Sequence, residues 1–434
     1  DFAEIVLTQQ AEVTPEIYWG PGSITQNAQG KLQLKVYLTH DVAFPDSFQQ
    51  NFSTYKPGKL LDDSYYFRME ATDYRGNTWR CDRLHISRDI VLSAAGDASG
   101  TINAAVPHIE VITERQGDIG GNKIWLAILG KLPIPFNTRE ELGVDFSLTK
   151  LKAKLFDDTD VEIMKRDGYT LLFATHEINP IDEKTIDKLL EGLSIATGQY
   201  LQRVYKCVRH GNMEKFWLGS YGDESNARHL PPPLSISTQH AVAFTEFLSR
   251  YIAFSRETHH SYFGYWQKLY SAWQAGLMVS ALPIAIYVEG LVNEFFEPLT
   301  AEDPTVVKSV QYVIDVLDKL ELDTAHRERI KGSVKNVANG SVARGLRHLA
   351  REGWFEPSLV KTWREVRNKS AHAFDFTQEQ EHEKIQIVVS AVLACLHLFY
   401  VLLMIRINFR SIFIDLSQLG FPERKLLPLP STDT

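Results

Sequence analysis

The sequence predicts an α+β protein of several domains, on the basis of three observations. Short alternating stretches with frequent turn signals fill residues 1–150, as in a β-rich sandwich or barrel-like module. Residues 151–235 mix strand-like and helical patterns and end in a proline-rich break, which predicts a small α/β unit and a linker. From Ser237 the pattern becomes helical, which predicts an all-α bundle within residues 236–434.

The β-rich module is predicted from strict alternation. Residues 31–38 alternate polar and apolar side chains over their whole length, which is typical of a half-buried strand. Residues 64–71 and 124–129 are further predicted strands, separated by glycine-containing turns. The polar residues of this module show no catalytic spacing, so we interpret it as a sensor or a regulatory domain.

The middle of the chain predicts strands at 171–175, 199–208 and 215–218 around one helix at 181–196. Asp182 and Glu183 begin this helix, where the helix dipole favours carboxylates. The run from Arg228 to Pro233 ends in three prolines and is the main predicted domain boundary.

The C-terminal part predicts long helices at 241–254, 262–282, 281–296, 306–320, 328–352 and 383–407, the fifth interrupted by Asn339-Gly340. Residues 385–405 are apolar and long enough to span a bilayer. A buried core helix that also forms a dimer seam fits better, because nothing else in the chain resembles a membrane protein. His397 is then a hydrogen-bonded core residue rather than a ligand.

One polar motif lies between the apolar helices. Before it, apolar residues recur at three- and four-residue spacing, a helical face made by Leu359, Val360, Trp363 and Val366. Arg367, Asn368 and His372 then place a cation, an amide and an imidazole within six residues. Two other pairs have similar spacing. Arg80…His85 lies in strand-like surroundings, and we interpret it as an arginine and a histidine of a strand ladder. Arg203…His210 crosses from a strand into a turn, and we interpret it as chance.

These residues resemble a known family. Glu289 in Tyr-Val-Glu-Gly-Leu, the run from Trp363 to His372, and the long apolar final helix are similar to a HEPN domain. The ApeA-like HEPN proteins of bacterial anti-phage defence are the most similar, over roughly residues 240–410. The resemblance implies a HEPN helical bundle that forms a homodimer, with two Arg…His motifs facing one shared cleft.

The resemblance also implies a function. Arg367 and His372 would be the active pair of a metal-independent ribonuclease without cofactors, with Asn368 as a polar helper and Glu289 nearby. The implied role is abortive infection, in which this toxin cleaves host RNA, with tRNA as the expected kind. A phage-derived trigger would act on the N-terminal domain. The expected location is the cytoplasm, and the three dispersed cysteines favour a reducing compartment.

Charge is distributed unevenly along the chain. The net charge of −8 argues against non-specific coating of nucleic acid, but residues 327–369 hold eleven Lys and Arg against four Asp and Glu. Such a segment suits a phosphate-bearing substrate. A solvated helix face is the plain alternative. The predicted RNA contacts are Lys369, Arg364, Lys361, Arg347 and Arg344.

The motif suits RNA cleavage because RNA carries its own nucleophile, the 2′-hydroxyl. His372 could take the hydroxyl proton near neutral pH. Arg367 could stabilise the charged phosphorane and Glu289 could hold Arg367 by an ion pair. Two alternatives remain open: Arg367 caps its helix while His372 packs in the next turn, or a non-catalytic HEPN module binds a nucleotide or a partner protein.

Overall fold

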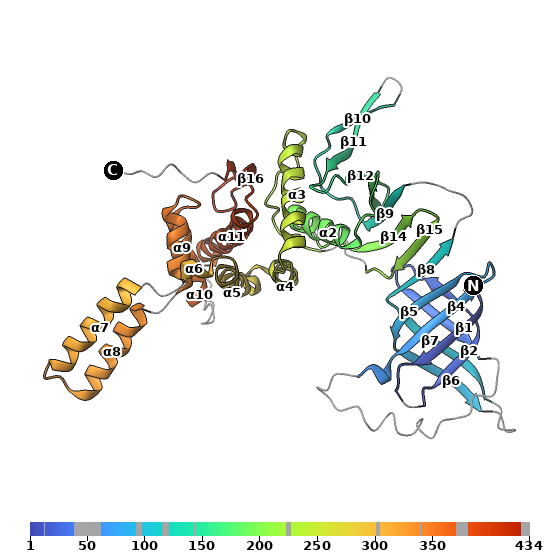
Figure 1. Ribbon diagram of the computed structural model, residues 1–434, viewed down its shortest axis with the longest axis horizontal. Coiled ribbons are helices and arrows are strands. Elements are labelled where there is room, and N and C mark those ends of the chain that lie inside the picture. Colours follow the sequence, from blue (N-terminus) through green and yellow to red (C-terminus); the bar gives the residue numbers. More distant parts are fainter. Residues whose placement is uncertain are drawn as a thin grey trace. The chain divides into compact units, whose positions relative to one another are not determined.

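The computed structural model describes residues 1–12, 14–38, 62–92, 98–114, 121–142, 145–222, 227–300, 304–338, 341–369 and 381–426. The chain forms two compact units. The first contains residues 1–132, 137–182 and 201–227, and the second contains residues 133–136, 183–200 and 228–434. An antiparallel sheet makes up the first unit and helices dominate the second, so the chain is an α+β protein of more than one domain, as predicted (Figure 1).

The sheet of the first unit has fifteen described strands in the order β10-β11-β12-β13-β9-β14-β15-β8-β5-β4-β1-β2-β3-β7-β6. Their bounds are β1 Phe2–Gln9, β2 Ile17–Gln26, β3 Leu32–Tyr37, β4 Phe67–Asp73, β5 Thr78–Leu84, β6 Ile86–Leu92, β7 Ala98–Val106, β8 His108–Glu114, β9 Asn122–Leu129, β10 Thr138–Leu142, β11 Asp145–Lys154, β12 Asp160–Arg166, β13 Tyr169–His176, β14 Arg203–His210 and β15 Met213–Gly219. A short 3-10 helix, η1 (Asp63–Tyr65), precedes β4.

The hydrophobic core of this sheet is made by side chains that alternate between buried and exposed along its strands. Along β3, Leu32, Leu34 and Val36 are buried while the residues between them are exposed, as the period of two requires. Their side chains join one hydrophobic cluster with residues of β1, β4 and β7. Figure 1 shows this part of the sheet curled into a barrel-like shape. The strands predicted at 31–38, 64–71 and 124–129 are therefore present as β3, β4 and β9.

The structure divides the chain differently from the predicted domains. Residue 150 lies inside β11, and β9 pairs with both β13 and β14, so the predicted α/β unit shares the sheet of the first 150 residues. Its helix, α2 (Glu183–Thr197), belongs to the second unit and packs on α3 (Ala241–Glu257). The second unit resumes at Arg228, where the sequence predicts the main boundary.

The second unit is a helical bundle centred on α5 (Leu277–Phe295), which contacts α4 (Tyr262–Ala275), α6 (Glu297–Thr300), α9 (Val342–Arg351), α10 (Pro357–Lys369) and α11 (Glu381–Arg406). The helices α7 (Pro304–Lys319) and α8 (Thr324–Ala338) pack on each other. The 3-10 helix η2 (Thr238–His240) precedes α3, and the hairpin of β16 (Ile412–Ile414) and β17 (Glu423–Lys425) follows α11. Whether this bundle is a HEPN domain stays a prediction.

One predicted helix is in fact two. The pattern over 262–282 predicts a single helix, but α4 ends at Ala275 and α5 begins at Leu277. Gly276 lies between them with a φ of 129°, a conformation that glycine adopts without the steric cost of a side chain. The chain can therefore turn back here and pack α4 on α5.

The helix α11 is mostly buried. Among the described residues, two helices, Leu277–Phe295 and Ile385–Arg406, are long and apolar enough to cross a membrane, but 72% of an 18-residue apolar window of the second is buried. This burial fits the predicted core helix. His397 on α11 is 4% exposed, its Nδ1 lies 3.5 Å from Oδ1 of Asp415, and its ring stacks on Phe413. It is thus a core residue, as predicted.

His260 should make the stability of the bundle depend on pH. Burial and the nearby charge of Lys188 lower the pKa of His260 to about 4. The unfolded chain then takes up a proton near pH 6.5, before the folded chain does, so the stability should fall as the pH drops from about 6.5 toward 4. Since the ring is only partly buried, we expect a loss of about 1–2 kcal/mol.

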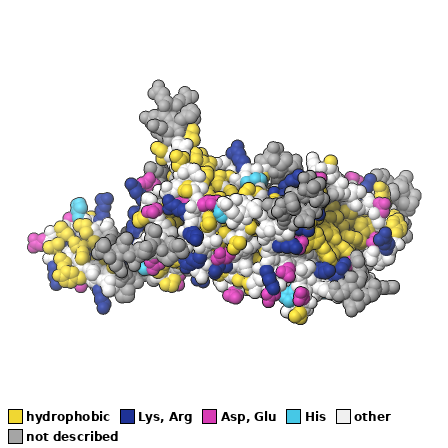
Figure 2. Space-filling view, turned by 90° about the horizontal axis from the view of Figure 1, so that it is seen from above, with side chains coloured by type: hydrophobic (Ala, Val, Ile, Leu, Met, Phe, Trp, Pro, Cys, Tyr) yellow, Lys and Arg dark blue, Asp and Glu magenta, His cyan; other side chains and the backbone are white. Residues whose placement is uncertain are grey.

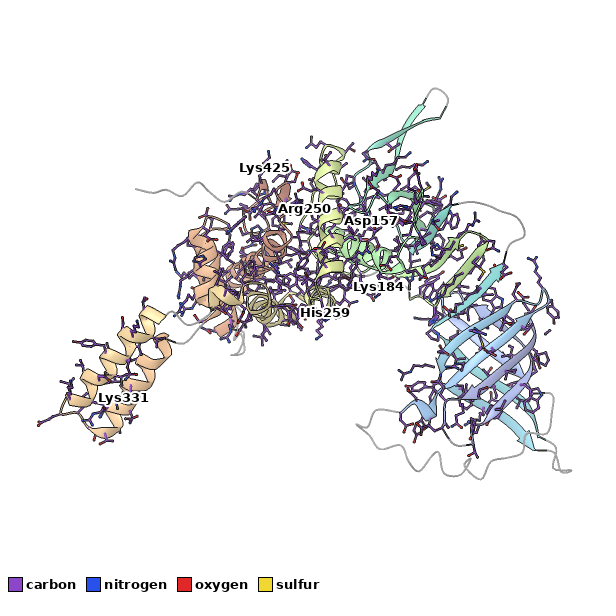
Figure 3. All side chains as sticks on the ribbon, viewed as in Figure 1. Asp157, Lys184, Arg250, His259, Lys331 and Lys425 are labelled. Carbon is purple, nitrogen blue, oxygen red and sulfur yellow. The ribbon has the colours of Figure 1, made fainter. Side chains whose placement is uncertain are left out.

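Thermal melting between pH 7 and pH 5 checks this expectation. His260→Gln should melt with a smaller loss of Tm on acidification than the wild type. The matched control is His259→Gln, which replaces the exposed neighbouring histidine labelled in Figure 3. Equal losses of Tm in the two variants would contradict the prediction.

Candidate active site

The candidate site forms along the contact between α5 and α10. Trp363 of α10 is 4% exposed, and its Nε1 donates a hydrogen bond of 2.9 Å to the carbonyl oxygen of Ala285 on α5. Four residues further along both helices, Arg367 binds Glu289. Because four residues are about one helical turn, these are two successive contacts along one seam, the first buried and the second open to solvent.

The Arg367–Glu289 contact is bidentate. Nε of Arg367 lies 2.6 Å from Oε2 of Glu289, and Nη2 lies 3.3 Å from Oε1. The side chains are 47% and 31% exposed. An ion pair this exposed contributes about 0–1 kcal/mol to stability, so its main effect is to orient the guanidinium. The predicted ion pair is therefore present, and it engages the edge of the guanidinium that carries Nε and Nη2.

Arg367 faces a cavity of about 560 Å³. Its walls come from α5, α6, α9 and α10 and consist of Glu289, Asn293, Thr300, Ser341, Val342, Ala343, Trp363, Arg364, Arg367 and Asn368. The N-terminus of α9 is part of the wall: Ser341 caps this helix, and its Oγ accepts a hydrogen bond of 3.2 Å from the N–H of Arg344. A helix N-terminus beside two arginines suits an anion such as phosphate.

A second cavity of about 470 Å³ adjoins the first and shares Arg364 and Asn368 with it. Its other lining residues are Arg347, Pro357, Val360, Lys361 and Glu365. Three of the five predicted RNA contacts thus line this second cavity: Arg347, Lys361 and Arg364. Arg344 lies in the first turn of α9 and lines neither cavity. Lys369 is the last residue of α10, and its side chain is outside the description.

His372 lies outside the described residues, so the structure does not place the predicted general base. Asn368, the predicted helper, is exposed and lines both cavities. Within the described ranges, no group of three or more histidine, cysteine, aspartate or glutamate side chains could hold a metal ion.

The cations of the basic segment are distributed over three helices, α8, α9 and α10. Four of its eleven cations, Arg327, Arg329, Lys331 and Lys335, are on α8, which packs on α7. Lys331, labelled in Figure 3, is held by Asp318 of α7 at 2.5 Å. This cation is therefore engaged within the α7–α8 pair. On the face in Figure 2, side chains of both signs are mixed.

Sequence reasoning missed three polar residues of the first cavity: Asn293, Thr300 and Ser341. Asn293 follows Glu289 by four residues on α5, so helical spacing could have identified it. Ser341 follows Asn339-Gly340, a turn signal after which a serine cap is expected. Thr300 gives no signal, since α6 is a single helical turn.

Three residues of the two other Arg…His pairs have contacts within the sheet. Arg80 on β5 pairs with Glu70 at 3.1 Å. Arg203 lies 4.5 Å from the centre of the Trp217 ring, and Nδ1 of His210 lies 3.1 Å from Oδ1 of Asn122. Both Arg203 and His210 are on β14, so their pair does not end in a turn as expected. These contacts give Arg80, Arg203 and His210 structural roles, so no catalytic role is needed to account for them.

No protein-family model, curated protein or solved structure matches the chain. What bears on function is therefore the chemistry of the site. It offers an oriented guanidinium, a second arginine, an amide and the N-terminus of a helix around a hollow. Such groups stabilise a phosphate that gains negative charge. Because Glu289 binds Arg367 through both carboxylate oxygens, it orients the guanidinium.

Proposed function

We propose that the chain is a metal-independent endoribonuclease of the HEPN type. The observation that carries the proposal is Arg367, oriented by Glu289 at a cavity that also presents Arg364 and the N-terminus of α9. This arrangement would hold a phosphodiester by charge-assisted hydrogen bonds and would favour its dianionic transition state. The resemblance of the motif to HEPN domains supports the choice of RNA as the substrate.

The proposed reaction uses the nucleophile of the substrate. The 2′-oxygen attacks the adjacent phosphorus, and its proton passes to His372. The bond from phosphorus to the 5′-oxygen breaks, and that oxygen takes up a proton to leave as a hydroxyl. The products are a 2′,3′-cyclic phosphate and a 5′-hydroxyl end. One histidine does not easily serve as both base and acid, so a homodimer that supplies two is part of the proposal.

The proposed biological role is defence against phage. A ribonuclease that cleaves host RNA, with tRNA as the proposed target, is toxic unless it is restrained. The sheet of the first unit would then sense a phage-derived trigger and release the activity. The proposed location is the cytoplasm, where the RNA is found.

Incubation of the purified full-length protein with total RNA in excess EDTA tests the proposal. We expect the wild type to cleave RNA and to leave cyclic-phosphate ends, and we expect His372→Ala to be slower by about 100- to 10,000-fold, the usual effect of a general base. Equal cleavage by the two proteins would place the activity elsewhere. The proposed restraint leaves a low basal rate that equimolar protein reveals, so RNA that stays intact for hours with the wild type would overturn the proposal.

A second candidate function is a non-catalytic module that binds a nucleotide through the same cavity. It is favoured by the α9 N-terminus, since this feature and the arginines bind the phosphates of a nucleotide as well as those of RNA. The two functions differ in one result. For the binding module, Arg367→Ala would weaken nucleotide binding, and RNA would remain intact with either protein.

A further inference from the structure

The two adjoining cavities differ in what they offer. The first contains the ion pair of Arg367 with Glu289. The second places three cations, Arg347, Lys361 and Arg364, around Val360 and Pro357, with Glu365 as the one carboxylate among its lining residues. The cations are exposed and Val360 is 4% exposed. A cavity lined by three cations and by the apolar side chains of Val360 and Pro357 suits a sugar-phosphate unit better than a free ion.

The cations of α10 form a ladder. Lys361, Arg364 and Arg367 follow one another at three-residue spacing, which puts them on neighbouring turns of one helix face. From Lys361 to Arg367 the helix rises about 9 Å, at ~1.5 Å for each residue. Successive phosphates of one nucleic-acid strand are spaced by about 3.4 Å along its axis in a duplex, and by more when a single strand is extended. The ladder therefore spans two or three phosphates.

Arg364 connects the two cavities. It lines both of them, as does Asn368, so a strand that leaves the first cavity along α10 enters the second without crossing another element. Arg347 approaches from α9, which packs on α10, and completes the second cavity from the other side. A strand in this position would have its neighbouring phosphate between cations of two helices.

We propose that the second cavity is a subsite for the phosphodiester next to the scissile one, so that the substrate is a single-stranded segment of RNA bound through at least two consecutive phosphates. This inference rests on the proposed function. The subsite is formed by Arg347, Lys361 and Arg364, and it orients the strand while Arg367 acts on the reacting phosphate. We therefore expect cleavage in a loop or at an end of a folded RNA, because a base-paired strand would bring its complementary strand into the same site.

Binding of a 2′-O-methyl RNA oligonucleotide to the full-length protein tests the subsite. This probe has no free 2′-hydroxyl, so it cannot be cleaved, and its affinity can be measured by fluorescence anisotropy over a series of NaCl concentrations. Each phosphate contact to a single strand contributes about 0.7 to the slope of log K against log [NaCl]. The double variant Arg347→Gln/Lys361→Gln should therefore reduce that slope by about 1.4 relative to the wild type.

The matched control is Arg329→Gln, which removes an exposed cation from α8. It should leave the slope unchanged. A double variant with the wild-type slope would overturn the subsite while the ribonuclease proposal stands, provided that the wild type cleaves the same oligonucleotide with free 2′-hydroxyls. A wild type that neither binds the probe nor cleaves that oligonucleotide would overturn the proposed function itself.

Discussion

Arg367→Ala should slow RNA cleavage by about a thousandfold while the chain keeps its fold. A preorganised donor that faces developing negative charge typically contributes a factor of about 100 to 1,000 to the rate, and a guanidinium is among the strongest of such donors. Its exposed ion pair with Glu289 contributes only about 0–1 kcal/mol to stability. Single-turnover cleavage rates and thermal melting measure the two effects separately.

Substitutions of the pair distinguish orientation from charge. Arg367→Lys keeps the charge and loses the planar fork, so we expect a loss of about 10- to 100-fold. Glu289→Gln keeps one acceptor oxygen and weakens the hold on Arg367, and we expect a loss of about tenfold. The order of rates should be wild type, Glu289→Gln, Arg367→Lys, Arg367→Ala.

Exchange of the two charges is the sharpest test of this site. Glu289→Arg/Arg367→Glu rebuilds an ion pair between α5 and α10 but moves the cation to the other helix. Its Tm should stay near that of the wild type, and its cleavage rate should remain as low as that of Arg367→Ala. Recovery of the rate to within tenfold of the wild type would show that the pair matters only for structure.

Local patterns predicted most of the elements because they report which side of an element is buried. The face expected before the motif, made by Leu359, Val360, Trp363 and Val366, is buried along α10 in the structure. Once that face is fixed, Arg367 must lie at its polar edge, one turn after Trp363. The resemblance, and not the periodicity of α5, predicts that Glu289 lies beside Arg367.

The pairing of distant strands could not be predicted in this way. The register of β9 with β13 and β14 depends on contacts between residues far apart in sequence, such as Ala127 with Leu171 and Tyr205. Nothing local to 151–182 shows that its strands join a sheet begun by the first 150 residues. The predicted boundary at residue 150 therefore lies inside β11.

The same reason limits the prediction of the site. The second wall of the first cavity is the start of α9, and its place beside α10 follows from how α6, α9 and α10 pack. The helix predicted at 328–352, interrupted at Asn339-Gly340, corresponds to α8 and α9, and no local pattern shows that α8 packs on α7. Charge along a sequence becomes a surface only after the helices have been placed.

Trp363→Ala should have the largest effect on stability among changes at the site, about 3–5 kcal/mol. Trp363 is 4% exposed, fills the seam between α5 and α10, and donates a hydrogen bond to the carbonyl of Ala285. The substitution would leave a cavity the size of an indole one turn below Arg367. Urea unfolding followed by circular dichroism at 222 nm measures the loss in the helical unit.

Trp363→Phe is the matched control, because it keeps an aromatic ring in the seam and removes only the Nε1 donor. The carbonyl of Ala285 keeps its acceptor role within α5, so this change should cost about 1–2 kcal/mol. If the seam sets the position of Arg367, cleavage should fall in Trp363→Ala at temperatures where the protein is still folded, and far less in Trp363→Phe. A folded Trp363→Ala variant with the wild-type cleavage rate would mean that Glu289 alone suffices to orient the guanidinium.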